Sequence, residues 1–258
     1  MLESEDMPLT TDVSPIFIGW DVGGWNCDKN PASRDALVVI DSQRQITGKP
    51  WRGNLRRCIN QSGNTSEFIG KLLELCELDS TGFVAAPAVL AIDTPLGFSS
   101  AFIDLIMQGR ATGPIENSSS NPYLFRHTER FLFERGLSPL SAVKDMIGSQ
   151  ATKGMHVLAR FAPYIERCGV WTDNQHLRVI EAYPASGKRS TVMRDLLQCY
   201  GRPPQLGHVD QWDALACALI AWVFHFKPEL LAQPCADAPE REGWIFVPAD
   251  GLTAQSEK

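Results

Sequence analysis

Short apolar runs that stop at an acidic residue recur along the chain. Ile16–Gly24 (IFIGWDVGG), Pro87–Gly97 (PAVLAIDTPLG) and Leu177–Tyr183 (LRVIEAY) all have this form, and turn residues follow each run. Continuous apolar runs of this length, bounded by Gly or Pro, predict buried strands. The acids at the predicted strand ends are Asp21, Asp93 and Glu181. Because ligand sites in open sheets form beyond the carboxyl ends of parallel strands, these acids mark a candidate site.

Two further strands are expected soon after the first. Ala36–Asp41 (ALVVID) is apolar, and Gln45–Trp51 follows it after the three-residue turn 42–44. So short a connection predicts an antiparallel meander at the start of the domain. Arg241–Val247 is expected to add a short terminal strand.

Helical periodicity is clearest in the middle of the chain. Ser66–Leu78 carries an apolar stripe, with Ser66 as the expected N-cap. Gly148–Arg167 is expected to form another helix. The stretch between Ser99 and Gly148 is expected to be mostly helical, with a loop rich in Ser, Asn and Gly at Gly109–Asn121.

The most unusual helix predicted is Val209–Phe226 (VDQWDALACALIAWVFHF). It is almost entirely apolar, yet it carries Asp210 and Asp213 in its first turn. Three-residue spacing places both carboxylates on one face of a helix. One interpretation is that the acids only suit the positive helix N-terminus, with Asp210 as the cap. The other is that they join the acids at the strand ends.

Composition supports one soluble α/β domain. The chain has 258 residues, of which 44% are hydrophobic, enough for a sizeable core. Residues 16–248 are expected to form a single domain between loose tails at 1–15 and 249–258, both of which are polar. The seven cysteines include no C-x-x-C pair, which favours a reducing, cytoplasmic setting without disulfides or structural zinc. No run is long and apolar enough to cross a membrane.

The charge balance limits the possible partners. A net charge of −6 gives no global basic field for gripping a long nucleic acid. A nucleic-acid or nucleotide substrate, if bound, is therefore expected to be small, structured or presented by a partner.

Carboxylates from several elements predict a divalent-metal site. Crowded acids are stable at neutral pH only if cations neutralise them or some are protonated. Hard oxygen ligands select Mg²⁺ or Mn²⁺, which can bind the attacking and leaving oxygens of phosphodiester hydrolysis. The acids of this constellation are Asp21, Asp93, Glu181, Asp210 and Asp213.

Other residues are expected around the acids. Gly23 and Gly24 allow a sharp turn and a close approach of ligand. Arg126 and Glu129, three residues apart, fit either a surface pair or neighbours of the site. The expected supporting or substrate-binding set is Glu181, Gly23, Gly24, Arg126, Glu129 and Lys153. The segment ASGKRST at 185–191 lacks the Ser or Thr after Lys that a phosphate-binding loop requires.

Five strings in order resemble one family. IGWDVGG, LAIDTPLGF, NPYLFRHTERF, VIEAYPA and HVDQWDALACALIAW together span most of the chain. They are similar to the predicted RNase H-like nucleases grouped as domain of unknown function 429. The resemblance implies a mixed sheet that opens with three antiparallel strands and continues with parallel ones, flanked by helices. It also implies acids at the first and fourth strand ends and on a late helix, which fall on Asp21, Asp93, Asp210 and Asp213. These four are the predicted catalytic residues, and Asp21, Asp93 and Asp213 are the predicted metal ligands.

Two other functions remain open. Actin-like and sugar-kinase phosphotransferases resemble this fold and open with an acid followed by glycines, as Asp21 to Gly24 do. Trp25, however, stands where those proteins usually have Thr or Ser. A non-catalytic binding scaffold is the third possibility, and the full set of acids argues against it.

Overall fold

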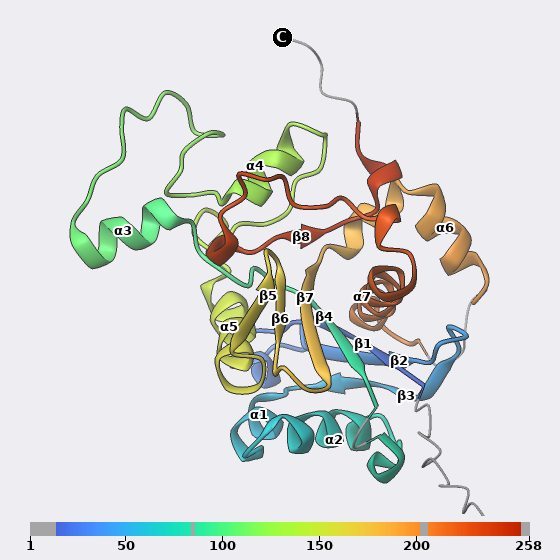
Figure 1. Cartoon of the computed structure of the whole chain (residues 1–258). Coiled ribbons are helices and arrows are strands. Elements are labelled where there is room, and N and C mark those ends of the chain that lie inside the picture. Colours follow the sequence, from blue (N-terminus) through green and yellow to red (C-terminus); the bar gives the residue numbers. More distant parts are fainter. Residues whose placement is uncertain (1–13, 84–85, 202–205, 254–258) are drawn as a thin grey trace, which may run out of the picture.

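The computed structural model describes residues 14–83, 86–201 and 206–253, and an eight-stranded mixed sheet runs through it (Figure 1). The strand order is β3-β2-β1-β4-β7-β6-β5, and β8 also pairs with β7. The strands are β1 (Ile16–Asp21), β2 (Asp35–Ile40), β3 (Ile46–Gly53), β4 (Ala88–Asp93), β5 (Tyr164–Arg167), β6 (Val170–Thr172), β7 (Leu177–Ala182) and β8 (Ile245–Phe246).

Strand directions divide the sheet into three parts. β1, β2 and β3 form an antiparallel meander, as predicted. β1, β4 and β7 are parallel neighbours, and β8 is parallel to β7. β6 and β5 then extend the sheet in antiparallel fashion. The predicted α/β mixed sheet flanked by helices is therefore present.

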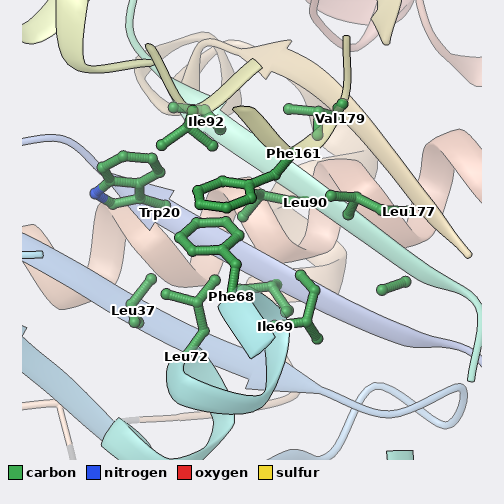
Figure 2. Packing of buried hydrophobic residues seen from close by; sticks show 14 of the residues in the cluster. Trp20, Leu37, Phe68, Ile69, Leu72, Leu90, Ile92, Phe161, Leu177 and Val179 are labelled. Carbon is green, nitrogen blue, oxygen red and sulfur yellow. The ribbon is translucent and has the colours of Figure 1, made fainter. Parts of the chain in front are cut away.

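One face of the sheet is covered by α1 (Arg56–Gln61), α2 (Thr65–Leu75) and α5 (Gly148–Phe161). Phe68 of α2 and Phe161 of α5 stack with ring centroids 4.3 Å apart. Figure 2 shows these rings against Trp20 of β1 and Leu90 of β4. Alternate strand residues supply this layer because successive side chains of a strand point to opposite faces.

The other face is covered by α7 (Val209–Phe226) and, at its side, α6 (Thr191–Gln198). α7 lies directly on β1 at Gly19, where an added Cβ would come within 1.8 Å of the Ala214 carbonyl oxygen. The small residues of α7, including Ala214 and Ala218, are fully buried in this contact. Close approach therefore explains both the glycine in the strand and the alanines in the helix.

The region between β4 and α5 is less helical than expected. It contains only α3 (Ser100–Gln108) and α4 (His127–Phe133), and turns fill most of the remainder. α3 buries none of its side chains and extends away from the sheet (Figure 1). The loop predicted at residues 109–121 is present, but the prediction of a mostly helical remainder was wrong, because residues 134–147, which include Gly136 and Pro139, form turns.

Three other boundaries differ from the predictions. The helix expected over Gly148–Arg167 ends at Phe161, and the hairpin of β5 and β6 follows. Asn64, not Ser66, caps α2, because its side chain accepts a hydrogen bond from the Glu67 N–H. The predicted terminal strand shortens to β8. Most of the predicted 1–15 tail and the last five residues of the chain lie outside the described residues.

No helix among the described residues combines the length and the apolar character needed to cross a membrane.

Candidate functional site

Two of the predicted acids lie side by side at the carboxyl ends of neighbouring parallel strands. Asp21 ends β1 and Asp93 ends β4, and the two residues are register partners on these parallel strands. Strand alternation places them on the same face as Phe17 and Ala91, which pack in the layer under α7. Both carboxylates therefore leave the sheet on the side of the late helix.

α7 brings a third acid to the same place. Asp213 lies just after the first turn of α7 and immediately before Ala214, the residue that contacts β1 at Gly19. Asp213 is half-buried, and its charge acts on both Asp21 and Asp93. The sequence-predicted metal ligands Asp21, Asp93 and Asp213 are thus grouped by the fold.

Burial and mutual repulsion oppose the ionisation of these acids. Burial raises the pKa of Asp21 to about 9, with further increases from Asp93, Asp210, Asp213 and Asp35. Burial, Asp213 and Glu181 raise the pKa of Asp93 to about 8. Burial also raises the pKa of Asp213, although Lys188 opposes this effect. At neutral pH the cluster must therefore hold protons or a cation.

Asp210 has a different position from the other three acids. Its Oδ2 accepts hydrogen bonds from the Arg34 N–H at 3.1 Å and from Arg52 Nε at 2.8 Å. Its Oδ1 lies 3.0 Å from Nδ1 of His208, the residue that caps α7. The prediction that Asp210 caps the helix was wrong. Its carboxylate instead ties the first turn of α7 to β3, and it acts on Asp21 through its charge.

Glu181 is held on the opposite face of the sheet. It pairs in register with Ile92, which packs in the layer around α5. Its two carboxylate oxygens accept hydrogen bonds from the Arg126 guanidinium at 2.7 and 2.8 Å, and one also accepts from the Leu96 N–H at 2.9 Å. Glu181 thus fixes the turn after Asp93 and adds negative charge near it.

Arg126 and Glu129 are not a surface pair. Both are buried, and Arg126 bridges Glu129 and Glu181 while also donating to the Glu242 carbonyl oxygen. The Glu129 carboxylate also accepts from the Arg126 N–H and so caps α4. This network connects β7, α4 and the segment before β8, behind the acidic site.

A buried pair that the sequence did not reveal supports the turn after β1. Asp35 and Lys153 are both fully buried and form an ion pair. Burial raises the pKa of Asp35, and the Lys153 charge together with several hydrogen bonds opposes that shift. Asp35 accepts hydrogen bonds from Trp20 Nε1 and the Gly23 N–H, and Lys153 donates to the Gly23 carbonyl oxygen at 3.2 Å. Lys153 therefore holds the turn from within the protein, where substrate does not reach it.

The two glycines of this turn are explained by internal packing. A Cβ on Gly23 would lie 2.7 Å from Cys27 Cβ and 2.8 Å from the Asp35 backbone. A Cβ on Gly24 would lie 2.9 Å from Ser149 Oγ. The close approach that these glycines permit is thus made by the chain itself, and the expectation of a close ligand contact here has no support.

A pocket of about 190 Å³ opens beside Asp21 and Asp93. Its wall includes Thr94, Gln150, Glu181 and Tyr183. The Thr94 hydroxyl oxygen is buried, and it has no hydrogen-bond partner among the described residues. A buried polar atom without a partner is rare, which is consistent with a ligand or ion in this pocket.

The donor set of the pocket fits a hard divalent cation. Asp21 and Asp93 supply carboxylate oxygens to the pocket, and Asp213, which lines a different hollow, would have to reach the ion from α7. Mg²⁺ and Mn²⁺ prefer such oxygen donors, whereas thiolate and imidazole donors favour other metals. A cation here would also remove the repulsion that raises the pKa values of the three acids.

No known protein family, curated protein or solved structure matches the chain.

Proposed function

We propose that the protein is a Mg²⁺- or Mn²⁺-dependent nuclease that hydrolyses phosphodiester bonds. The observation that carries the proposal is the pair Asp21 and Asp93 on the wall of one small pocket, with Asp213 of α7 near enough for its charge to raise the pKa of both. Such a cluster costs stability unless it binds something positive. A cluster of acids with raised pKa values is therefore more typical of a functional site than of a purely structural one.

The chain's own residues have separate roles in this proposal. Asp21 and Asp93 hold the cation from the sheet, and Asp213 holds it from α7. The bound cation would activate water and neutralise charge on the phosphate. Asp210, paired with Arg52, fixes α7, while Glu181 and Lys153 fix the two turns that follow the strands.

The sheet order supports an RNase H-like assignment. Three antiparallel strands lead into parallel β4 and β7, and the acids stand at the ends of the first and fourth strands and on a late helix. This is the arrangement implied by the resemblance to the RNase H-like family. The assignment is a fold-level analogy, so the nuclease activity must be tested at the site.

A groove next to Asp213 favours a nucleic-acid strand as the substrate. It has a volume of about 380 Å³, and its wall includes Lys188, Arg194, Trp212 and Asp213. Exposed cations bind phosphates and an aromatic ring stacks on bases, which is the combination that single-stranded nucleic acids require. The groove thus provides local positive charge within an acidic protein.

The turn after β1 argues against the kinase alternative. A phosphate-binding turn needs backbone N–H groups free to meet phosphate oxygens. Here the Gly23 N–H donates to Asp35 Oδ1 at 2.9 Å, and the Trp25 N–H donates to Ser149 Oγ at 3.0 Å. Two of the donors that a nucleotide would use are therefore already engaged.

The test is a cleavage assay with Mn²⁺ on single-stranded, branched and RNA–DNA hybrid oligonucleotides. Wild-type protein should cleave at least one class, and Asp21→Asn, Asp93→Asn and Asp213→Asn should each abolish cleavage. Glu116→Gln changes an exposed acid away from the pocket and serves as the matched control. Lys188→Gln combined with Arg194→Gln should raise KM more than it lowers kcat.

Three results would contradict the proposal. Cleavage that persists in Asp21→Asn would identify a contaminant. ATP hydrolysis that is lost in Asp21→Asn would replace the nuclease with a phosphotransferase. Metal binding without turnover of any substrate would indicate a binding scaffold.

A further inference from the structure

A second cluster of metal-ligating side chains lies away from the acidic pocket. His127 opens α4, and Cys235 and Asp237 belong to the segment between α7 and β8. One ligand atom from each residue lies within 4.8 Å of the other two. The 108-residue separation of His127 and Cys235 hides this cluster from any search for sequence spacing.

We propose that His127, Cys235 and Asp237 bind a zinc ion, with the fourth coordination position open. Imidazole, thiolate and carboxylate are the three donor types that zinc uses in proteins, and three protein ligands with an open position is its usual catalytic or exchangeable arrangement. The thiolate and carboxylate together balance the two positive charges of the ion. The sequence-based expectation of no structural zinc considered only closely spaced cysteines.

The donors already converge without a metal. His127 Nε2 lies 3.0 Å from Cys235 Sγ. The first turn of α4 is fixed independently, because the His127 N–H donates to Glu242 Oε2 at 2.7 Å. Tetrahedral zinc with bonds of about 2.0–2.3 Å needs its ligand atoms about 3.3–3.7 Å apart. His127 Nε2 and Cys235 Sγ must therefore separate slightly to admit the ion between them.

Zinc binding balances in protons as well as in charge. The Cys235 thiol loses its proton to solvent when it binds the ion as thiolate. A neutral His127 that binds through Nε2, the nitrogen facing Cys235 Sγ, carries its proton on Nδ1. The net release is therefore one proton for each ion bound.

The surroundings leave room for a fourth ligand. The three donors line a pocket of about 800 Å³ whose wall also contains Arg130 and Arg135. Arg130 Nε is buried and has no hydrogen-bond partner among the described residues. The two arginines thus place positive charge on the wall of the pocket that the three donors line.

The test uses the full chain, stripped of metal by a chelator and then kept in excess Mg²⁺ to fill the acidic pocket. Zn²⁺ should bind with a stoichiometry of one per chain, releasing one proton. Co²⁺ in its place should give visible bands of a tetrahedral site and a thiolate-to-cobalt charge-transfer band. Cys235→Ser and His127→Gln should lose both signals, whereas Cys199→Ser, which changes an exposed cysteine elsewhere, should keep them.

Two outcomes would overturn the zinc site: a Co²⁺ spectrum without the thiolate band, or unchanged Zn²⁺ affinity in Cys235→Ser. Circular dichroism of each variant, with the Mn²⁺ response of the acidic pocket, separates loss of the site from loss of the fold. The two metal sites use different residues, so either can fail without the other.

Discussion

Asp21 and Asp93 are register partners at the last positions of two parallel strands, so the fold holds their backbones side by side whatever the charge on their carboxylates. The repulsion between them cannot be relieved by separating the strands. It is relieved only by a proton or by a cation.

The first prediction concerns the pH dependence of the metal-free protein. The folded-state pKa values of about 9 for Asp21 and about 8 for Asp93 exceed the ordinary value of 3.8. The folded state therefore binds protons more tightly than the unfolded state, and the contribution of these groups to stability falls as pH rises from about 4 to 9. Urea unfolding in chelator should show this fall, and Asp21→Asn should flatten it. An equal slope in the variant would contradict the raised pKa.

The second prediction concerns the metal response. Mn²⁺ or Mg²⁺ must displace protons from the acids, so the apparent affinity should increase with pH up to about 9, the pKa of Asp21. At a concentration a hundredfold above Kd, the free energy of unfolding should rise by about 2.7 kcal/mol. Melting curves measure this, with Glu116→Gln as the matched control. A wild-type Tm that does not change at millimolar Mn²⁺ would contradict the proposed metal site.

The third prediction concerns the buried ion pair. Lys153→Met should lower the free energy of unfolding by about 3–5 kcal/mol, because it leaves Asp35 buried without its partner. Adding Asp35→Asn should recover part of the loss. Lys144→Met, at a half-exposed lysine, should change stability by less than about 1 kcal/mol. If the single and double variants are equally unstable, the two side chains are not coupled.

The fourth prediction concerns the contact between β1 and α7. Gly19→Ala places a Cβ 1.8 Å from the Ala214 carbonyl oxygen, so α7 must shift. The cost should be about 3 kcal/mol or more. Since Asp213 precedes Ala214, the Mn²⁺ response should weaken as well. Gly113→Ala is the control, because an added Cβ there meets nothing within 4 Å. It should change neither the free energy of unfolding nor the Mn²⁺ response, and equal effects of the two substitutions would contradict the prediction.

Local patterns predicted the strand ends well. Apolar runs that stop at Asp21 and Asp93 correspond to β1 and β4, because burial on both faces leaves a continuous apolar sequence. The position of Asp213 followed from helical spacing. These predictions needed only the chain on either side of each residue.

The partners of the supporting residues could not be predicted in the same way. Arg126 meets Glu181 across 55 positions and Lys153 meets Asp35 across 118, so no local pattern records either pair. Asp35 did carry one signal, since Asp is uncommon at the start of a buried strand. The end of α5 at Phe161 also had a signal in the sequence, because Pro163 disfavours helical backbone at the residue before it.

The placement of α7 has a consequence for how the protein is made. Asp21 and Asp93 belong to the first half of the chain, and Asp213 reaches them only when α7 packs across β1, β2 and β4. During synthesis the N-terminal strands leave the ribosome long before this helix does. The three carboxylates therefore come together only after α7 has been synthesised and packed, so the repulsion among them is absent from any shorter nascent chain.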